Sequence, residues 1–182
     1  MESKASQKRR LILETAIQIV LENDFTALTL DAVSKQAGIS KGGLLYHFPN
    51  KDSLIKGIAQ FVFEELYVNF DRFAEKDSHE SGKWTRALVT ASKKDLEQNA
   101  ELNVGIFAAS YLDPELSRDI SLGYQSILTK LENDGIDPVT ATIVRLALDG
   151  LYYSRMLNIA PLDKARQDEV FQHLVAMTKK EE

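Results

Sequence analysis

Residues 29–51 read TLDAVSKQAGISKGGLLYHFPNK, a pattern typical of two short helices joined by a tight turn. The hydroxyl of Thr29 can cap the first helix. Gly38 follows the last apolar residue of helical spacing and can adopt the positive φ that ends a helix. Ser40 can cap the second helix, which should be short because Pro49 disfavours helical backbone at the residue before it. The stretch therefore predicts a helix-turn-helix.

The second helix, residues 41–48, has a composition that suits contact with DNA. Gly42 and Gly43 lie in its first turn, although each costs about 1 kcal/mol of helix stability relative to Ala. Residues without a side chain let backbone donors come close to an anion such as a phosphate. Tyr46 and His47, one turn further on, suit contacts with phosphates or base edges in a major groove. We therefore predict that this helix binds DNA.

The segment resembles the DNA-binding domain of TetR/AcrR-family bacterial transcriptional repressors. The residues that match the family pattern are Thr29, Ala37, Gly38, Ile39, Ser40, Lys41, Gly42, Leu44, Tyr46, His47, Phe48, Pro49, Lys51 and Leu54. Gly43 and Leu45 depart from it, because many members have Thr or a small polar residue at the first position and an aromatic residue at the second. These departures leave the identity of the operator bases open.

The resemblance implies roles for individual residues. Thr29, Tyr46 and Lys51 would bind phosphates, whereas residues 40–45 and His47 would supply base-edge or further backbone contacts. The expected DNA-binding residues are Thr29, Ser40, Lys41, Gly42, Gly43, Leu45, Tyr46, His47 and Lys51.

The charge distribution agrees with a DNA-binding N-terminal part. The chain has a net charge of −5, but residues 1–60 hold 8 Lys/Arg and 6 Asp/Glu, a net of +2, whereas residues 61–182 hold 14 and 21, a net of −7. A basic end steers a protein toward DNA. The chain has no cysteine and no run of eighteen apolar residues. We expect a cytoplasmic protein that does not interact with membranes.

No catalytic pattern is present in the sequence. Ser40 and His47 are about two helical turns apart, too far for the hydrogen bond of a Ser-His-Asp triad with Asp52. His47, His79 and His173 have no metal-ligand spacing such as HExxH. Phosphate-loop and dinucleotide-binding fingerprints are also missing. We expect no enzyme activity, no catalytic residue, no metal and no cofactor.

Helical periodicity runs through the whole chain, so we predict an all-α protein. The first helix should run from residue 8 to about residue 23, a long fourth helix from 51 to about 73, a sixth over 102–112, and an eighth from 138 to about 158. Asn50, Asp113 and Asp137 can cap the helices that follow them. The predicted domains are a helix-turn-helix domain at 1–50, a connecting helix at 51–74, and a helical regulatory and dimerisation domain at 75–182.

The eighth helix is apolar around most of its circumference. A helix of this kind is either central in a core or covered on one side by a partner. The resemblance favours the second reading, because such regulators dimerise through their last two helices, and a two-fold dimer presents two recognition helices to DNA. We expect a homodimer. The expected interface residues are Val144, Leu148, Leu151, Phe171, Leu174 and Val175, for which the alternative is a buried core.

The resemblance also implies a small-molecule effector bound in the C-terminal domain. The candidate ligand-binding residues are Phe61, Trp84, Phe107, Tyr111 and Tyr152, although aromatic residues at helical spacing are also common in plain cores. Two functions remain open. The first is a repressor that a small molecule releases from a palindromic operator in double-stranded DNA. The second is a DNA-binding scaffold of the same fold that a protein partner controls, or that has no small ligand.

Overall fold

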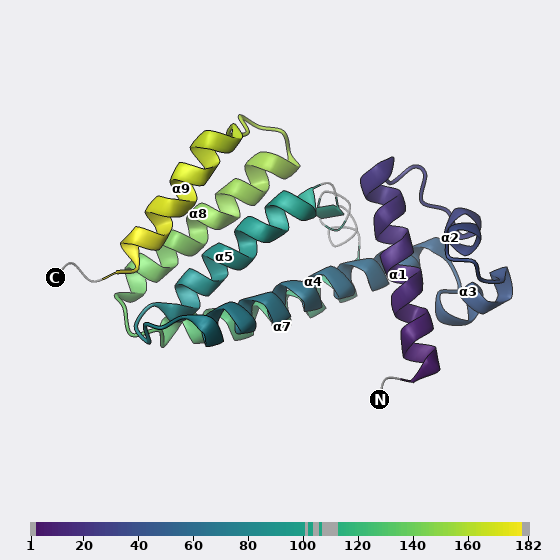
Figure 1. Ribbon diagram of the computed structural model, residues 1–182, viewed down its shortest axis with the longest axis horizontal. Helices are drawn as coiled ribbons and strands as arrows, with labels where there is room; N and C mark the ends of the chain where they lie inside the picture. Colours follow the sequence, from purple (N-terminus) through teal and green to yellow (C-terminus); the bar gives the residue numbers. More distant parts are fainter. Residues whose placement is uncertain (1–2, 101, 104–105, 107–112, 180–182) are drawn as a thin grey trace. The chain divides into compact units, whose positions relative to one another are not determined.

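The computed structural model describes residues 3–100, 102–103, 106 and 113–179, and this part of the chain contains eight α-helices and no strand (Figure 1). The all-α prediction is therefore confirmed. The helices are α1 (Lys4–Glu22), α2 (Leu30–Gln36), α3 (Lys41–His47), α4 (Lys51–Lys76), α5 (Lys83–Gln98), α7 (Pro114–Glu132), α8 (Pro138–Met156) and α9 (Lys164–Met177). Of the predicted helix at 102–112, residues 102, 103 and 106 are described and helical, and the others lie outside the described residues.

The chain divides into two compact units. Unit 1 comprises residues 1–63 and 101–117, and unit 2 comprises residues 64–100 and 118–182. The division falls within α4 and within α7, so each of these helices contributes residues to both units. The predicted domain limits at residues 50 and 74 stay a prediction.

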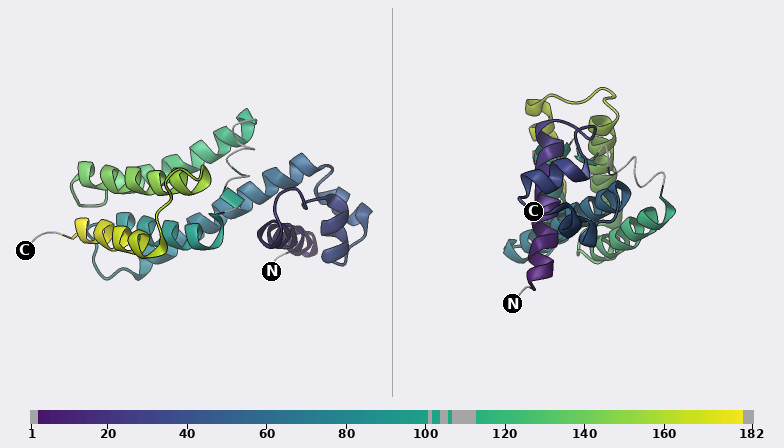
Figure 2. Two further views of the ribbon diagram at one scale, coloured as in Figure 1. Left: turned by 90° about the horizontal axis from the view of Figure 1, so that it is seen from above. Right: turned by 90° about the vertical axis from the view of Figure 1, so that its right-hand side faces the viewer.

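In unit 1, α1, α2 and α3 pack together around one apolar core, and the same grouping is visible in two further views (Figure 2). The core takes one side chain or more from each helix of the unit, including Ile12, Val33, Leu44, Phe48 and Ile58, all nearly or fully buried. The first helix begins earlier than predicted. Ser3 caps it by accepting a hydrogen bond from the Ser6 amide at 3.1 Å, so α1 starts at Lys4 rather than at residue 8.

In unit 2, α5, α8 and α9 lie side by side (Figure 1). Their facing sides form one core with the second half of α4 and with α7. Its buried members include Phe70, Leu88, Ile127, Leu148 and Phe171. This core places α8 against intrachain neighbours on one side of the helix.

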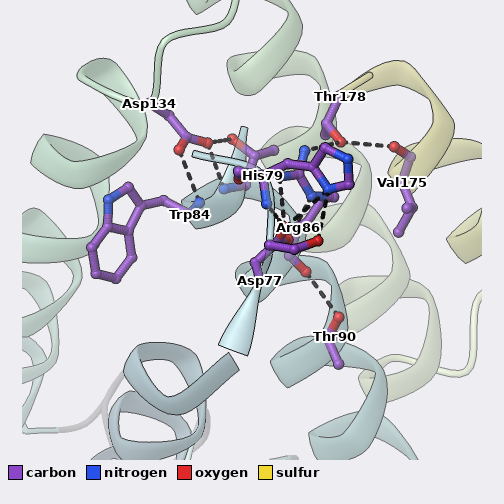
Figure 3. A network of polar contacts seen from close by, with 10 residues as sticks. Asp77, His79, Trp84, Arg86, Thr90, Asp134, Val175 and Thr178 are labelled. Atoms are coloured by element: carbon purple, nitrogen blue, oxygen red, sulfur yellow. Dashed lines mark hydrogen bonds and ion pairs between the residues drawn. The ribbon is translucent and has the colours of Figure 1, made fainter. Parts of the chain in front are cut away.

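A buried polar network joins the start of α5 to the α7–α8 connection and the end of α9 (Figure 3). The Asp134 carboxylate accepts hydrogen bonds from the backbone amides of Trp84 and Thr85, at 2.9 and 2.7 Å, and from the Thr85 hydroxyl at 2.6 Å. The nearby Arg86 guanidinium donates to the Asp77 carboxylate and to the Thr178 hydroxyl. Asp134 therefore takes the place of an N-cap for α5, whose own N-cap residue is a glycine.

Candidate nucleic-acid interface

The turn between α2 and α3 has the geometry that its residue types predict. Thr29 Oγ1 accepts a hydrogen bond from the Ala32 amide at 3.1 Å, which caps α2. Gly38 has a φ of +66°, and the next amide, that of Ile39, donates to the Ser34 carbonyl at 3.0 Å. Ser40 Oγ then accepts from the Gly43 amide at 3.1 Å and caps α3. These contacts fix the direction of α3 relative to α2.

The α3 helix has one buried side and one exposed side. Leu44 is fully buried and Phe48, just past the end of the helix, is nearly so. On the opposite side, Tyr46 has 81% of its surface exposed and Leu45 has 37%. Gly42 belongs to the same exposed side. Gly42, Leu45 and Tyr46, all predicted to contact DNA, are therefore available to a partner, while Leu44 holds the helix in the core.

The two glycines of α3 differ in their surroundings. A Cβ at Gly42 would meet nothing within 4 Å. At Gly43 it would lie 3.1 Å from Ser40 Oγ and 3.4 Å from Lys8 Nζ. Crowding inside the chain therefore favours glycine at position 43, whereas nothing inside the chain requires it at position 42.

Cationic side chains surround α3. Lys8 brings its ammonium group from α1 to the first turn of α3, a contact that local sequence does not specify because 35 positions separate Lys8 from Gly43. Lys51 Nζ donates to the Phe25 carbonyl at 3.3 Å and is exposed. Lys41 is also exposed, but it forms an ion pair with the Asp31 carboxylate at 2.8 Å. These cations lie where phosphates beside α3 could meet them.

The surroundings of His47 favour the neutral form of its imidazole. Its partial burial lowers the pKa of the imidazole below the ordinary value of 6.5, and the positive charges of Lys8 and Arg9 lower this pKa further. The Tyr46 and His47 rings pack in a T-shaped arrangement, with centroids 5.1 Å apart. A neutral imidazole can act as a hydrogen-bond donor at one nitrogen and as an acceptor at the other.

Gly57 in α4 is a second positional requirement that sequence reasoning missed. A Cβ at this position would lie 2.5 Å from Cε1 of Phe48 and 3.2 Å from Cδ2 of Leu13. The absence of a side chain therefore lets α4 approach the end of α3 closely. Helical spacing alone carries no signal for this contact, since it depends on Leu13 of α1 and on Phe48 just past the end of α3.

Comparison with known proteins identifies the family. Residues 12–58 match the family described as bacterial regulatory proteins, tetR family. Residues 82–179 match the tetracyclin repressor-like C-terminal domain, and this match alone spans more than half of the chain. The chain belongs to the TetR family. It is therefore a DNA-binding transcriptional regulator.

Individual relatives extend this picture. UidR, an HTH-type transcriptional regulator of Escherichia coli K12, is 29% identical over 189 residues, which span 97% of this chain and 94% of that protein. The nucleoid occlusion factor SlmA of Marinomonas sp. is 29% identical over 79 residues, only 43% of this chain and 40% of that protein.

Within the described residues of our TetR-family chain, no helix is long and apolar enough to cross a membrane.

Solved structures share the fold. A TetR family member from Streptomyces coelicolor A3 superposes with a TM-score of 0.67 at 20% identity, covering 96% of this chain and 99% of that one. The multidrug binding protein EbrR, solved in complex with imidazole, has a TM-score of 0.62 at 19% identity, covering 96% and 92%. Likeness at this level of identity establishes the fold alone.

The predicted ligand-binding aromatics of this TetR-family chain have intrachain partners. Trp84 packs against Phe70 with ring centroids 5.3 Å apart, and Lys130 Nζ lies 4.3 Å from the centre of its ring. Tyr152 lies in unit 2 with Trp84, whereas Phe61 belongs to unit 1, where Arg10 lies 5.7 Å above its ring. The candidates Phe107 and Tyr111 lie outside the described residues.

Tyr152 is part of a cluster of polar side chains inside unit 2 that sequence reasoning missed. Its hydroxyl donates to Asp95 Oδ2 at 2.8 Å, and the Tyr124 hydroxyl donates to Asp149 Oδ1 at 3.0 Å. Burial and the nearby carboxylates raise the pKa of both phenols, so both stay protonated. Asp95 also lines a small polar pocket between α4 and α5. The pocket is lined by Glu65, Leu66, Asn69, Lys94, Asp95, Gln98 and Asn99.

The residues expected at a dimer interface lie mostly inside unit 2. Val144, Leu148, Phe171 and Leu174 are buried in its core, and Leu151 and Val175 pack against that core while partly buried. Because Val144, Leu148, Phe171 and Leu174 are already buried, contact with a second chain would remove little further apolar surface of these residues from water. The exposed apolar residues of α8 lie on its other side. They are Val139, Ile143, Leu146 and Tyr153.

Proposed function

We propose that this TetR-family regulator is a repressor that binds a palindromic operator as a homodimer and leaves it when a small molecule binds unit 2. The observation that carries the DNA-binding half is the exposed side of α3, with Leu45 and Tyr46 presented to solvent by capped and buried neighbours. A two-fold dimer would offer two such helices to two half-sites about 34 Å apart. The expected partners are thus double-stranded DNA, a second copy of the chain, and an effector.

Phosphate contacts by Lys51, Tyr46 and Thr29 supply the sequence-independent part of the affinity in this proposal. Lys51 is exposed, and its only described hydrogen bond is a long one to the Phe25 carbonyl. A phosphate would be a stronger partner because both groups are charged. Lys51→Ala should therefore weaken binding to all DNA sequences alike and reduce the slope of log affinity against log salt by about 1 per subunit.

Fluorescence anisotropy with operator and with random DNA, at several salt concentrations, measures both quantities. Lys56→Ala is the matched control, because Lys56 lies on the same helix as Lys51 but pairs with the Asp113 carboxylate at 2.5 Å and should not contact phosphate. An unchanged salt slope in Lys51→Ala would contradict the phosphate role of Lys51.

The proposed binding of an effector is supported by the cluster of polar side chains around Asp95 and Tyr152 in unit 2. Buried polar side chains within an apolar core are the usual means of orienting a small ligand. The structural neighbour EbrR is described as a multidrug binding protein and was solved with imidazole and with malachite green. A panel of small molecules should therefore contain compounds that raise the melting temperature of the protein by binding only its native state.

The same panel separates the two functions left open by the sequence. For a ligand-responsive repressor, a stabilising compound must also bind the operator complex more weakly than the free protein, by the factor with which it weakens DNA binding. Equal affinities for the free protein and the complex would favour the alternative, a DNA-binding scaffold controlled by a protein partner or without a small ligand. The partial likeness to the nucleoid occlusion factor SlmA is the observation that keeps this alternative in view.

A further inference from the structure

The exposed side of α3 carries few groups that can read bases by paired hydrogen bonds. How this side would recognise an operator rests on the operator binding proposed above. Guanine and adenine are typically read by two parallel hydrogen bonds from Arg, Lys, Asn or Gln. The α3 sequence KGGLLYH contains no Arg, Asn or Gln. Its single lysine, Lys41, is engaged by the Asp31 carboxylate at 2.8 Å. Readout of base edges by α3 must therefore depend largely on contacts other than paired hydrogen bonds.

Leu45 supplies an apolar group on this side. It lies three residues after Gly42 and one before Tyr46, and the three share the exposed side of the helix. A single exposed leucine on a protein surface has no special meaning. This one differs because it occupies the helix of a helix-turn-helix that faces the major groove in proteins of this class.

The major groove offers one apolar feature, the C5 methyl group of thymine. We propose that Leu45 reads thymine in each operator half-site by packing against this methyl group. The removal of both groups from water provides the free energy of discrimination. Cytosine presents an amino group and no methyl at the corresponding position, so it offers Leu45 nothing to pack against.

Gly42 keeps the path to the base open. It lies one turn before Leu45 on the exposed side, and a Cβ there would meet no atom of the chain within 4 Å. The protein thus accepts the cost of a helical glycine without any gain in its own packing. Close approach of a partner to the helix surface at this position explains the residue, and close approach is what a leucine side chain needs to reach a groove-floor methyl group.

Deoxyuridine substitution tests the proposal, because it removes only the methyl group and keeps all base-pair hydrogen bonds. The operator is first found by selection from random double-stranded DNA, and each thymine is then replaced singly by deoxyuridine. At the thymine that Leu45 contacts, one substitution should weaken binding about fourfold, the effect of one buried methyl group, and substitution in both half-sites should weaken it about 15-fold.

Variants of Leu45 link the effect to this side chain. Leu45→Ala should bind the thymine and deoxyuridine operators equally well, whereas Leu45→Met, which keeps an apolar side chain of similar volume, should retain most of the difference. Tyr46→Phe, the adjacent exposed residue, should retain all of it. Leu45 is partly exposed and lies outside the buried core, so these variants should fold, and circular dichroism melting verifies that they do.

Three outcomes would overturn the proposal while leaving operator binding intact. They are a selected operator without thymine in its half-sites, no deoxyuridine position that weakens binding, and a full deoxyuridine effect in Leu45→Ala. A selection that enriches no sequence over random DNA would instead overturn the proposed function itself. The two failures are therefore distinguishable.

Discussion

At the scale of single residues, the glycines of unit 1 serve opposite purposes. Gly57 is required by the fold, because the ring of Phe48 occupies the space that a side chain would need. Gly42 faces open space. Helix propensity disfavours glycine at both positions. The reason for each glycine therefore lies in its surroundings, inside the chain for Gly57 and outside it for Gly42.

Replacement of each glycine by alanine should thus have opposite effects on stability. Gly42→Ala should raise the free energy of unfolding by up to about 1 kcal/mol, through helix propensity, and should weaken operator binding by hindering close approach. Gly57→Ala should lower the free energy of unfolding by about 1–3 kcal/mol, because the new methyl group overpacks against Phe48. Urea denaturation measures both changes. A destabilised Gly42→Ala would mean that an intrachain contact was overlooked.

His47 should make the protein sensitive to acid. Its pKa is lower in the folded than in the unfolded chain, so the folded state binds fewer protons. The contribution of His47 to stability is complete above the unfolded pKa, near 6.5, and is lost as the pH falls through the folded pKa. Between pH 7.5 and pH 5, the wild type should therefore lose more stability than His47→Gln. Denaturation of the wild type and of His47→Gln at several pH values tests this, and equal losses of stability in the two proteins would contradict it.

At the scale of secondary-structure elements, the sequence was most informative about helix ends. Thr29, Ser40, Asn50 and Asp137 each accept a backbone amide hydrogen bond at the start of a helix, as predicted. A cap is a contact between residues two or three positions apart, so local sequence can specify it. The start of α1 was missed because its cap, Ser3, precedes a polar first turn without the apolar spacing that marks a helix.

Contacts between elements were less predictable. The proximity of Lys8 to Gly43 depends on how α1 crosses α3, which periodicity does not specify. The two sides of α8 present the same difficulty. Both are apolar, so the sequence could not indicate that Val144 and Leu148 would be buried within the chain while Ile143 and Leu146 would be exposed. The candidate DNA-contacting side of α3 was easier to predict, because its motif lies within a single stretch.

The cap of α5 is a contact between distant elements with a measurable consequence. Asp134→Ala would leave the buried amides of Trp84 and Thr85 without their acceptor, so it should lower the free energy of unfolding by about 2–4 kcal/mol. Thr85→Val removes only the hydroxyl bond and should cost about 1 kcal/mol. Hydrogen exchange at the two amides provides a local test. Unchanged protection in Asp134→Ala would contradict the capping role.

At the scale of the whole molecule, the exposed side of α8 is the surface that best suits the proposed dimer. The positions 139, 143, 146, 150, 153 and 157 follow one another at alternating spacings of four and three, the spacing of a helix-packing seam. Five of them are exposed large apolar residues, and the sixth is Gly150, where a Cβ would meet nothing within 4 Å. The inward-facing side, with Val144 and Leu148, is already filled by α5 and α9. We therefore assign the proposed dimer surface to the outward-facing side.

Charged substitutions on the two sides of α8 should separate dimerisation from folding. Ile143→Glu and Leu146→Glu place a charge on the exposed side, so they should give a folded monomer by light scattering at micromolar concentration, because an interface cannot bury an unpaired carboxylate without a large free-energy cost. Leu122→Glu, at an even more exposed apolar residue of α7, should remain dimeric and serves as the control. Val144→Ala should instead lower the melting temperature, because it opens a cavity in the core of unit 2.

The monomeric variants should also lose most of their operator affinity, since a single recognition helix can occupy only one half-site. A wild type of monomer mass, or dimers that survive both glutamate substitutions, would contradict the assignment.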